Sequence, residues 1–218
     1  MREVSDALAS YGVDVQRAQK QHAAYVDALD VEVIKIPADP GLGDCCFIED
    51  TAVVENNRAL ITRMGFPRRR PEADAVRIAL RDLGYEIVEM APPATLDGGD
   101  VLRVGDRTFV GLSSRTNKEG ISALEEFLGQ ACTHIPVTKC LHLKSATTEY
   151  LDGALLIDRD LLDPFGDFEF IETKRPNALR MPHRCLVSDP ALEGTFVDIS
   201  EFEKADGGLT CSALLLFS

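Results

Sequence analysis

Residues 94–112, ATLDGGDVLRVGDRTFVGL, contain the pattern on which the predicted architecture rests: a loop running into a two-stranded hairpin. The hairpin turn is Gly105-Asp106, and the return strand is Arg107 to Leu112. A helix is expected next, from Asn117 to Leu128, followed by a glycine of the kind that commonly ends helices. These residues predict one unit made of loop, hairpin and helix.

The same order of elements recurs on both sides of this unit. Helices are predicted over Val13 to Leu29 and Glu72 to Leu83. Short strands are predicted at Val31 to Ile36, Ala52 to Val54, Ala59 to Thr62, Tyr85 to Met90, Tyr150 to Ile157, Leu179 to Val187 and Leu209 to Phe217. A unit that repeats every several tens of residues indicates blades of mixed α/β structure. Hairpins argue against a doubly wound sheet, because its parallel strands need crossover connections.

Composition and charge narrow the class of protein. The chain has 218 residues with 45% hydrophobic and 27% charged side chains, a composition typical of a soluble globular protein. No linker divides the sequence, so residues 1–218 are expected to form a single domain. Its net charge of −13 repels phosphate backbones, which excludes nucleic acid and favours a small cationic partner. No apolar run is long enough for a membrane span, and no secretory signal is evident, so a cytoplasmic protein is expected. The six cysteines lack zinc or disulfide spacing and are expected to be reduced thiols.

Two side chains are candidates for nucleophilic chemistry. Cys211 follows a glycine-rich turn at the entrance to an apolar run, where its thiol could point into a cleft or simply fill space in the core. His142 stands between two leucines and could act in catalysis or be structural. The residues alone leave both alternatives open.

Acidic and basic side chains supply candidates for binding. Glu49 and Asp50 are adjacent carboxylates without a neighbouring turn residue, and such a pair suits a planar guanidinium. Asp97 flanks a Gly-Gly pair, where turn formation is the alternative explanation. The basic run at 68–70 could be a solvated loop or an anchor for a carboxylate, and Arg115 could serve likewise. No nucleotide-binding, zinc-protease or serine-hydrolase motif occurs.

Taken together, several motifs resemble the dimethylarginine dimethylaminohydrolase family of guanidino-modifying enzymes. The motifs are DCCFIED at 44–50, ATLDGGDVL at 94–102, LHLKS at 141–145 and DGGLTC at 206–211. The resemblance implies a pentein fold, a five-bladed α/β propeller with a central active site. The family begins with one more strand before the region matched by Leu8, so the first blade is expected to be incomplete at the N-terminus.

The resemblance also implies hydrolysis of N-omega-methylated arginine to citrulline and a methylamine, without a cofactor or metal. By that resemblance Cys211 is the nucleophile, which forms a covalent thiouronium, His142 is the general acid and base, and Asp97 orients the histidine. The positions that match substrate-binding residues of the family are Leu8, Asp44, Glu49, Asp50, Arg69, Arg115, Ala205 and Asp206.

Two alternatives remain open. The chain could be a deiminase that acts on unmodified arginine, or a catalytically impaired, shortened relative that only binds arginine-like cations. Its retention of Cys211, His142 and Asp97 favours an enzyme.

Overall fold

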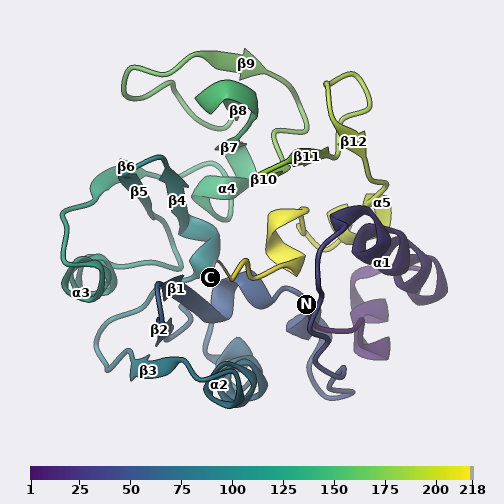
Figure 1. Cartoon of the computed structure of the whole chain (residues 1–218), viewed down its shortest axis with the longest axis horizontal. Coiled ribbons are helices and arrows are strands. Elements are labelled where there is room, and N and C mark those ends of the chain that lie inside the picture. Colours follow the sequence, from purple (N-terminus) through teal and green to yellow (C-terminus); the bar gives the residue numbers. More distant parts are fainter. Residues whose placement is uncertain (217–218) are drawn as a thin grey trace.

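The computed structural model describes residues 1–216, and four three-stranded sheets are arranged around its centre (Figure 1). The first two sheets contain β1 (Ala52–Glu55), β2 (Arg58–Ile61), β3 (Glu86–Glu89), then β4 (Val101–Val104), β5 (Arg107–Leu112), β6 (Thr133–Pro136). The other two contain β7 (Thr147–Glu149), β8 (Leu155–Ile157), β9 (Phe170–Glu172), then β10 (Ala178–Met181), β11 (Arg184–Val187), β12 (Thr195–Phe196). Their common arrangement confirms the predicted mixed α/β repeat.

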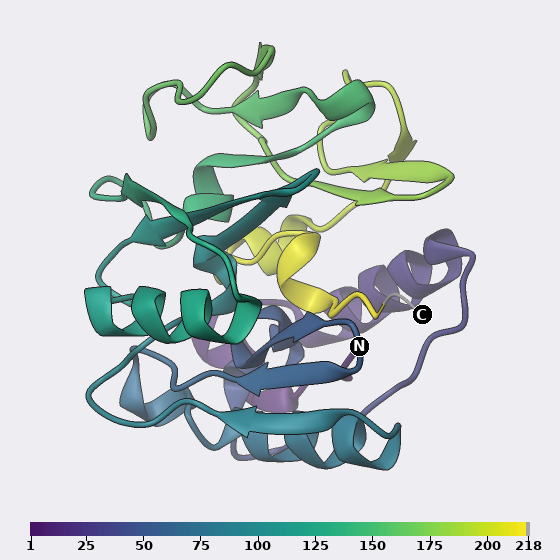
Figure 2. The same cartoon turned by 60° about the vertical axis from the view of Figure 1, so that its left-hand side comes forward.

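Every sheet has the same internal topology. Two strands form an antiparallel hairpin, and a third strand pairs parallel to the second. In the first two sheets a helix supplies the crossover to the third strand: α2 (Glu72–Asp82) and α3 (Lys118–Leu128). Both helices lie on the outside of the ring (Figures 1 and 2), and strands β1 and β4 lie nearer its centre (Figure 1).

Two predicted strands are wrong. Of the residues 31–36, only Ile36 forms a β-bridge, with Arg2, because no strand of the described residues pairs with the rest of this segment. Over 209–216 the chain forms a 3-10 turn at Thr210–Ser212, closed by the amide of Ala213, which donates to the carbonyl of Thr210 at 3.2 Å. Phe217 lies outside the described residues. The N-terminal stretch and residues 31–36 therefore meet in an isolated bridge and not in a three-stranded sheet. The incomplete first blade stays a prediction.

Both ends of the described chain share one apolar core. Helix α1 (Val15–Leu29) packs on α5 (Ser200–Glu203), and the same cluster contains Leu8, Tyr25, Phe202 and Leu209. The buried hydroxyl of Tyr25 donates to the carbonyl of Leu209 at 2.6 Å. This contact fixes the C-terminal turn against the N-terminal helix, next to the centre of the ring (Figure 1). Within residues 1–216 no helix has the length and apolar character that crossing a membrane requires.

Candidate active site

Residues from distant parts of the chain line one cavity at the centre of the ring. The cavity has a volume of about 640 Å³, and both Cys211 and His142 contribute to its wall. Cys211 lies half-buried in the turn Thr210–Ser212, and His142 directly precedes the short helix α4 (Leu143–Ala146). The structure thus brings the two predicted reactive side chains to the same space.

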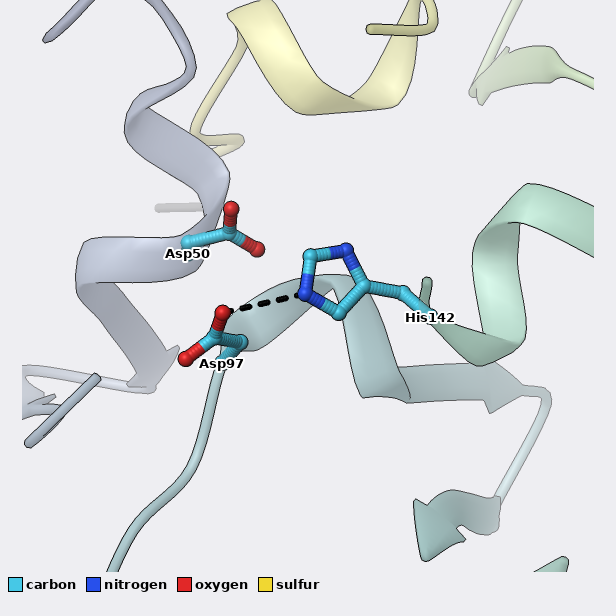
Figure 3. A group of neighbouring side chains, drawn as sticks. All are labelled: Asp50, Asp97 and His142. Carbon is cyan, nitrogen blue, oxygen red and sulfur yellow. Dashed lines mark hydrogen bonds and ion pairs between the residues drawn. The ribbon is translucent and has the colours of Figure 1, made fainter. Parts of the chain in front are cut away.

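His142 is paired with the carboxylate of Asp97. Its Nε2 lies 3.0 Å from Oδ2 of the fully buried Asp97, and the other ring nitrogen points away from that carboxylate (Figure 3). Asp97 is held in turn by the amide of Gly65, which donates to Oδ1 at 2.8 Å. Burial disfavours the charged imidazole, but the charge of Asp50 and the hydrogen bond to Asp97 outweigh it and raise the pKa of His142 to about 9. At neutral pH His142 is therefore an imidazolium.

Asp50 is a buried carboxylate with fixed partners on both oxygens. The amide of Gly99 donates to Oδ1 at 2.8 Å, and Arg69 donates to Oδ2 at 2.6 Å. Burial opposes ionisation, but the charges of His142 and Arg69 lower the pKa of Asp50 to about 2. Asp50 is consequently a permanent negative charge beside the imidazolium (Figure 3).

Arg69 does not point freely into the cavity. It is buried, and besides Asp50 it contacts both carboxylate oxygens of Glu72, at 2.9 Å for the Nη2–Oε2 contact. A role of Arg69 in binding a substrate carboxylate stays a prediction, and it requires one of these ion pairs to open.

Glu49 lies between a lysine and a threonine. Its carboxylate is paired with Lys144, and its Oε2 accepts a hydrogen bond of 2.9 Å from the hydroxyl of Thr210, the neighbour of Cys211. Burial raises the pKa of Glu49, and the charge of Lys144 opposes that rise. Lys144 itself lines the cavity.

The thiol of Cys211 lies in a negatively charged environment. Burial and the nearby charges of Glu49 and Asp50 raise the pKa of Cys211 to about 12. At neutral pH the thiol therefore keeps its proton.

The remaining predicted binding residues lie at differing depths. Leu8 is fully buried in the apolar core, Ala205 is half-buried, and Asp206 is exposed where it lines the cavity. Asp44 accepts a hydrogen bond of 2.9 Å from the hydroxyl of Tyr11. Arg115 places a guanidinium nitrogen 3.5 Å from Asp97, and the group stacks on Phe66 at 5.1 Å from the ring centre; Arg115 thus adjoins the histidine–aspartate pair.

Sequence reasoning missed two side chains that shape the site. Lys144 is part of the quoted LHLKS motif, but nothing in the sequence shows that it pairs with Glu49. Asp100 accepts hydrogen bonds from the hydroxyls of Ser113 and Thr116 and from the amide of Leu143, at 2.6 to 2.9 Å, and so fixes the start of α4 beside the histidine. The only sequence signal for it was its place in the DGGD turn.

One group of side chains has the geometry for a metal ion. Asp50, Asp97 and His142 offer ligand atoms that all lie within 4.8 Å of one another. Their partners, however, are already cations and donors: Arg69 on Asp50 and the imidazolium on Asp97. A metal ion would have to displace both positive charges, so the donor set does not fit one.

Comparisons with known proteins identify the family of the chain. The model of the arginine deiminase family matches residues 39–162. The N(G),N(G)-dimethylarginine dimethylaminohydrolase of Streptomyces coelicolor is 37% identical to this chain, covering 94% of the chain and 88% of the relative. The enzyme of that name from Pseudomonas aeruginosa is 29% identical over 98% of the chain and 95% of the relative. The chain belongs to the dimethylarginine dimethylaminohydrolase family.

Experimental structures of relatives share the architecture. A cysteine-to-serine mutant of the Pseudomonas aeruginosa enzyme, in complex with citrulline, superposes with a TM-score of 0.87 at 29% identity, covering 97% of this chain and 95% of that one. The N-terminal domain of a cyanobacterial arginine dihydrolase gives a TM-score of 0.83 at 16% identity, over 93% and 88% of the two chains, and supports the fold alone. The α/β fold of pentein type is confirmed.

Proposed function

We propose that the chain hydrolyses N-omega-methylated arginine, asymmetric dimethylarginine or monomethylarginine, to citrulline and a methylamine. The observation that carries this proposal is the shared cavity: Cys211 and the Asp97-paired His142 line it. Glu49 and Asp50 do not line it, but their negative charges act on the thiol of Cys211. Relatives of the same family carry this activity in their names, and one of them is known in complex with citrulline. The substrate is accordingly a small cationic amino acid, and the reaction requires no cofactor.

Carboxylates would hold the substrate for attack. A guanidinium carbon is a poor electrophile because its charge is spread over three nitrogens. In this proposal Glu49 and Asp50 bind the flat cation, which requires the pairs of Glu49 with Lys144 and of Asp50 with Arg69 to open. The cation is then held with its carbon near the sulfur, which replaces a random encounter by a held geometry. At the other end, Asp44 binds the α-amino group and Arg69 and Arg115 the carboxylate. Leu8, Ala205 and Asp206 complete the substrate-binding set in this proposal.

The protons can then be followed through the reaction. A bound cation lowers the pKa of Cys211 from about 12, the thiol proton leaves to water, and the thiolate adds to the guanidinium carbon. His142, an imidazolium below its pKa of about 9, donates a proton to the departing methylamine, leaving a thiouronium on the sulfur. Neutral His142 next takes a proton from water, and the hydroxide adds to the thiouronium carbon. The carbon–sulfur bond then breaks, the hydroxyl proton passes to the departing sulfur, and citrulline is released with the Cys211 thiol regenerated.

We further infer that residues 1–218 act as one domain in the cytoplasm. Residues from 99 to 211 line one cavity, and all six cysteines are free thiols, a state that a reducing compartment preserves.

The family model named after arginine deiminase supports a second candidate, hydrolysis of unmodified arginine to citrulline and ammonia. The two reactions share the thiouronium and differ in the amine released. A third candidate, a shortened relative that only binds arginine-like cations, predicts binding without any product.

Product analysis separates these candidates. The wild-type protein and Cys211→Ser are incubated with asymmetric dimethylarginine or with arginine, and citrulline, dimethylamine and ammonia are measured. We expect dimethylamine and citrulline in equal amounts from the methylated substrate, and a loss of at least about a thousandfold in Cys211→Ser. Ammonia from arginine at higher efficiency would support the deiminase instead. Calorimetric binding without product, unchanged in Cys211→Ser, would support the binding protein.

A further inference from the structure

We propose that Asn177 is a positioning residue that sets the placement of Cys211 relative to His142. This inference rests on the proposed function, because it concerns the same two side chains. Asn177 lines the cavity directly before β10, and it lies in none of the sequence motifs described above. Within residues 1–216 its side chain makes no hydrogen bond to the sulfur of Cys211 or to the imidazole of His142. It acts through the backbone of Lys144 and of Thr210.

The side-chain amide of Asn177 joins the two reactive segments. Its Nδ2 donates to the carbonyl of Lys144 at 3.3 Å, two residues after His142. Its Oδ1 accepts from the amide of Thr210 at 3.2 Å, one residue before Cys211. One planar group thus connects residues 142–144, the histidine segment, with residues 208–211, the cysteine turn.

Asn177 is itself held firmly. The hydroxyl and the amide of Ser188 donate to its backbone carbonyl at 3.0 and 3.3 Å. On either side of it, buried Thr148 donates its hydroxyl to the carbonyl of Pro176 and accepts from the amide of Ala178, both at 2.9 Å. Thr148 of β7 and Ser188, which directly follows β11, therefore fix the position from which the amide reaches the two segments.

The approach of the cysteine turn to this amide leaves no spare room. A Cβ added to Gly208 would lie 2.4 to 2.7 Å from the amide atoms of Asn177. Only a glycine allows the backbone to come so close. The close approach to Asn177 is therefore a second reason, besides turn formation, for the glycine at 208.

Asparagine meets both requirements where its charged counterpart does not. The Lys144 carbonyl needs a donor and the Thr210 amide needs an acceptor, and one carboxamide supplies both. An aspartate keeps the acceptor but turns an oxygen toward the Lys144 carbonyl. We therefore expect Asn177→Asp and Asn177→Ala each to release the cysteine turn from the histidine segment.

The test measures turnover and thiol reactivity separately. For Asn177→Ala and Asn177→Asp we expect kcat to fall about ten- to a hundredfold while KM changes less than threefold, because attack geometry is lost and cation binding is kept. The rate of Cys211 carbamidomethylation by iodoacetamide, followed by peptide mass spectrometry between pH 7 and 10, should shift more than threefold. Ser188→Ala, which loosens only the asparagine's backbone, should lower kcat by a smaller factor.

A matched control is Asn57→Ala, an exposed asparagine in the turn between β1 and β2, which should leave kcat and alkylation within twofold. A loss confined to the melting temperature, with kcat and alkylation within twofold of wild type in both Asn177 variants, overturns the proposal. If those variants do not fold, an unchanged kcat and alkylation rate in Ser188→Ala overturns it. If wild-type protein releases no citrulline, the proposed function fails, and the alkylation shift still decides whether Asn177 positions Cys211.

Discussion

A thiolate in the resting protein would require the pKa of Cys211 to lie below that of His142, and the structure gives the reverse order. Burial and two carboxylates raise the pKa of Cys211 to about 12, while Asp50 and Asp97 raise the pKa of His142 to about 9 against the effect of burial. At neutral pH the pair is a thiol beside an imidazolium. Because the thiolate and not the thiol is the nucleophile, the sulfur reacts slowly with other electrophiles until a cationic substrate binds and lowers the pKa of Cys211.

Removing one carboxylate should change binding and thiol reactivity in opposite directions. Glu49→Gln removes a negative charge that raises the pKa of Cys211, so alkylation of Cys211 at pH 8 should become several-fold faster. The same change removes a ligand for the cation, so KM for dimethylarginine should rise about tenfold or more. The rate of Cys211 alkylation in samples quenched at successive times measures the first effect, and steady-state kinetics measure the second.

Glu119→Gln provides the control for that experiment, because Glu119 is exposed on the outer helix α3. It should leave both quantities unchanged. Slower alkylation in Glu49→Gln would contradict the electrostatic account of the thiol.

At the scale of elements, local signals were sufficient for the hairpins and outer helices. The Gly105-Asp106 turn lies where the sequence places it, because turn residues fix a two-residue loop without help from the rest of the chain. Helices α2 and α3 begin and end within one residue of their predicted limits, since apolar spacing and a following glycine are local properties.

Elements that depend on distant partners could not be predicted in the same way. The extended pattern at 31–36 needs a neighbouring strand to become a sheet, and the structure supplies only the bridge to Arg2. In the site, motif resemblance identified Cys211, His142 and Asp97 as neighbours. It could not show that Arg69 is tied to Asp50 and Glu72, because such pairing depends on packing between elements.

Helix α3 depends on a close approach between elements that can be tested. A Cβ on Gly120 would lie 1.9 Å from the carbonyl oxygen of Thr95. Alanine favours helix by about 1 kcal/mol over glycine, but overpacking costs roughly 1–3 kcal/mol, and this contact is with rigid backbone. We expect Gly120→Ala to lower the free energy of unfolding in urea.

Ser122→Ala is the matched change, because Ser122 is exposed on the same helix. Its helix propensity gain should leave stability equal or slightly higher. A Gly120→Ala protein as stable as wild type would mean that α3 shifts outward without penalty.

At the scale of the whole molecule, the imidazolium links folding to pH. The pKa of His142 rises from 6.5 to about 9 on folding, so its stabilising contribution is complete below pH 6.5 and is lost as pH rises through 9. That shift corresponds to about 3 kcal/mol at most. Urea unfolding between pH 6 and 10 should therefore show stability declining over this range, and His142→Gln should flatten the decline. An equal slope in His142→Gln and wild type would contradict the assignment.

The apolar core that joins α1 to α5 also has a bearing on biosynthesis. Leu8 and Tyr25 leave the ribosome long before Phe202 and Leu209 are translated, a delay on the order of 10 s or more at about 5–20 residues per second. During that delay the amphipathic face of α1 lacks its native cover and is open to chaperones or to misassembly. Cys211 follows Leu209, so every nascent chain that ends before it lacks the proposed nucleophile and cannot attack arginine-like metabolites through it.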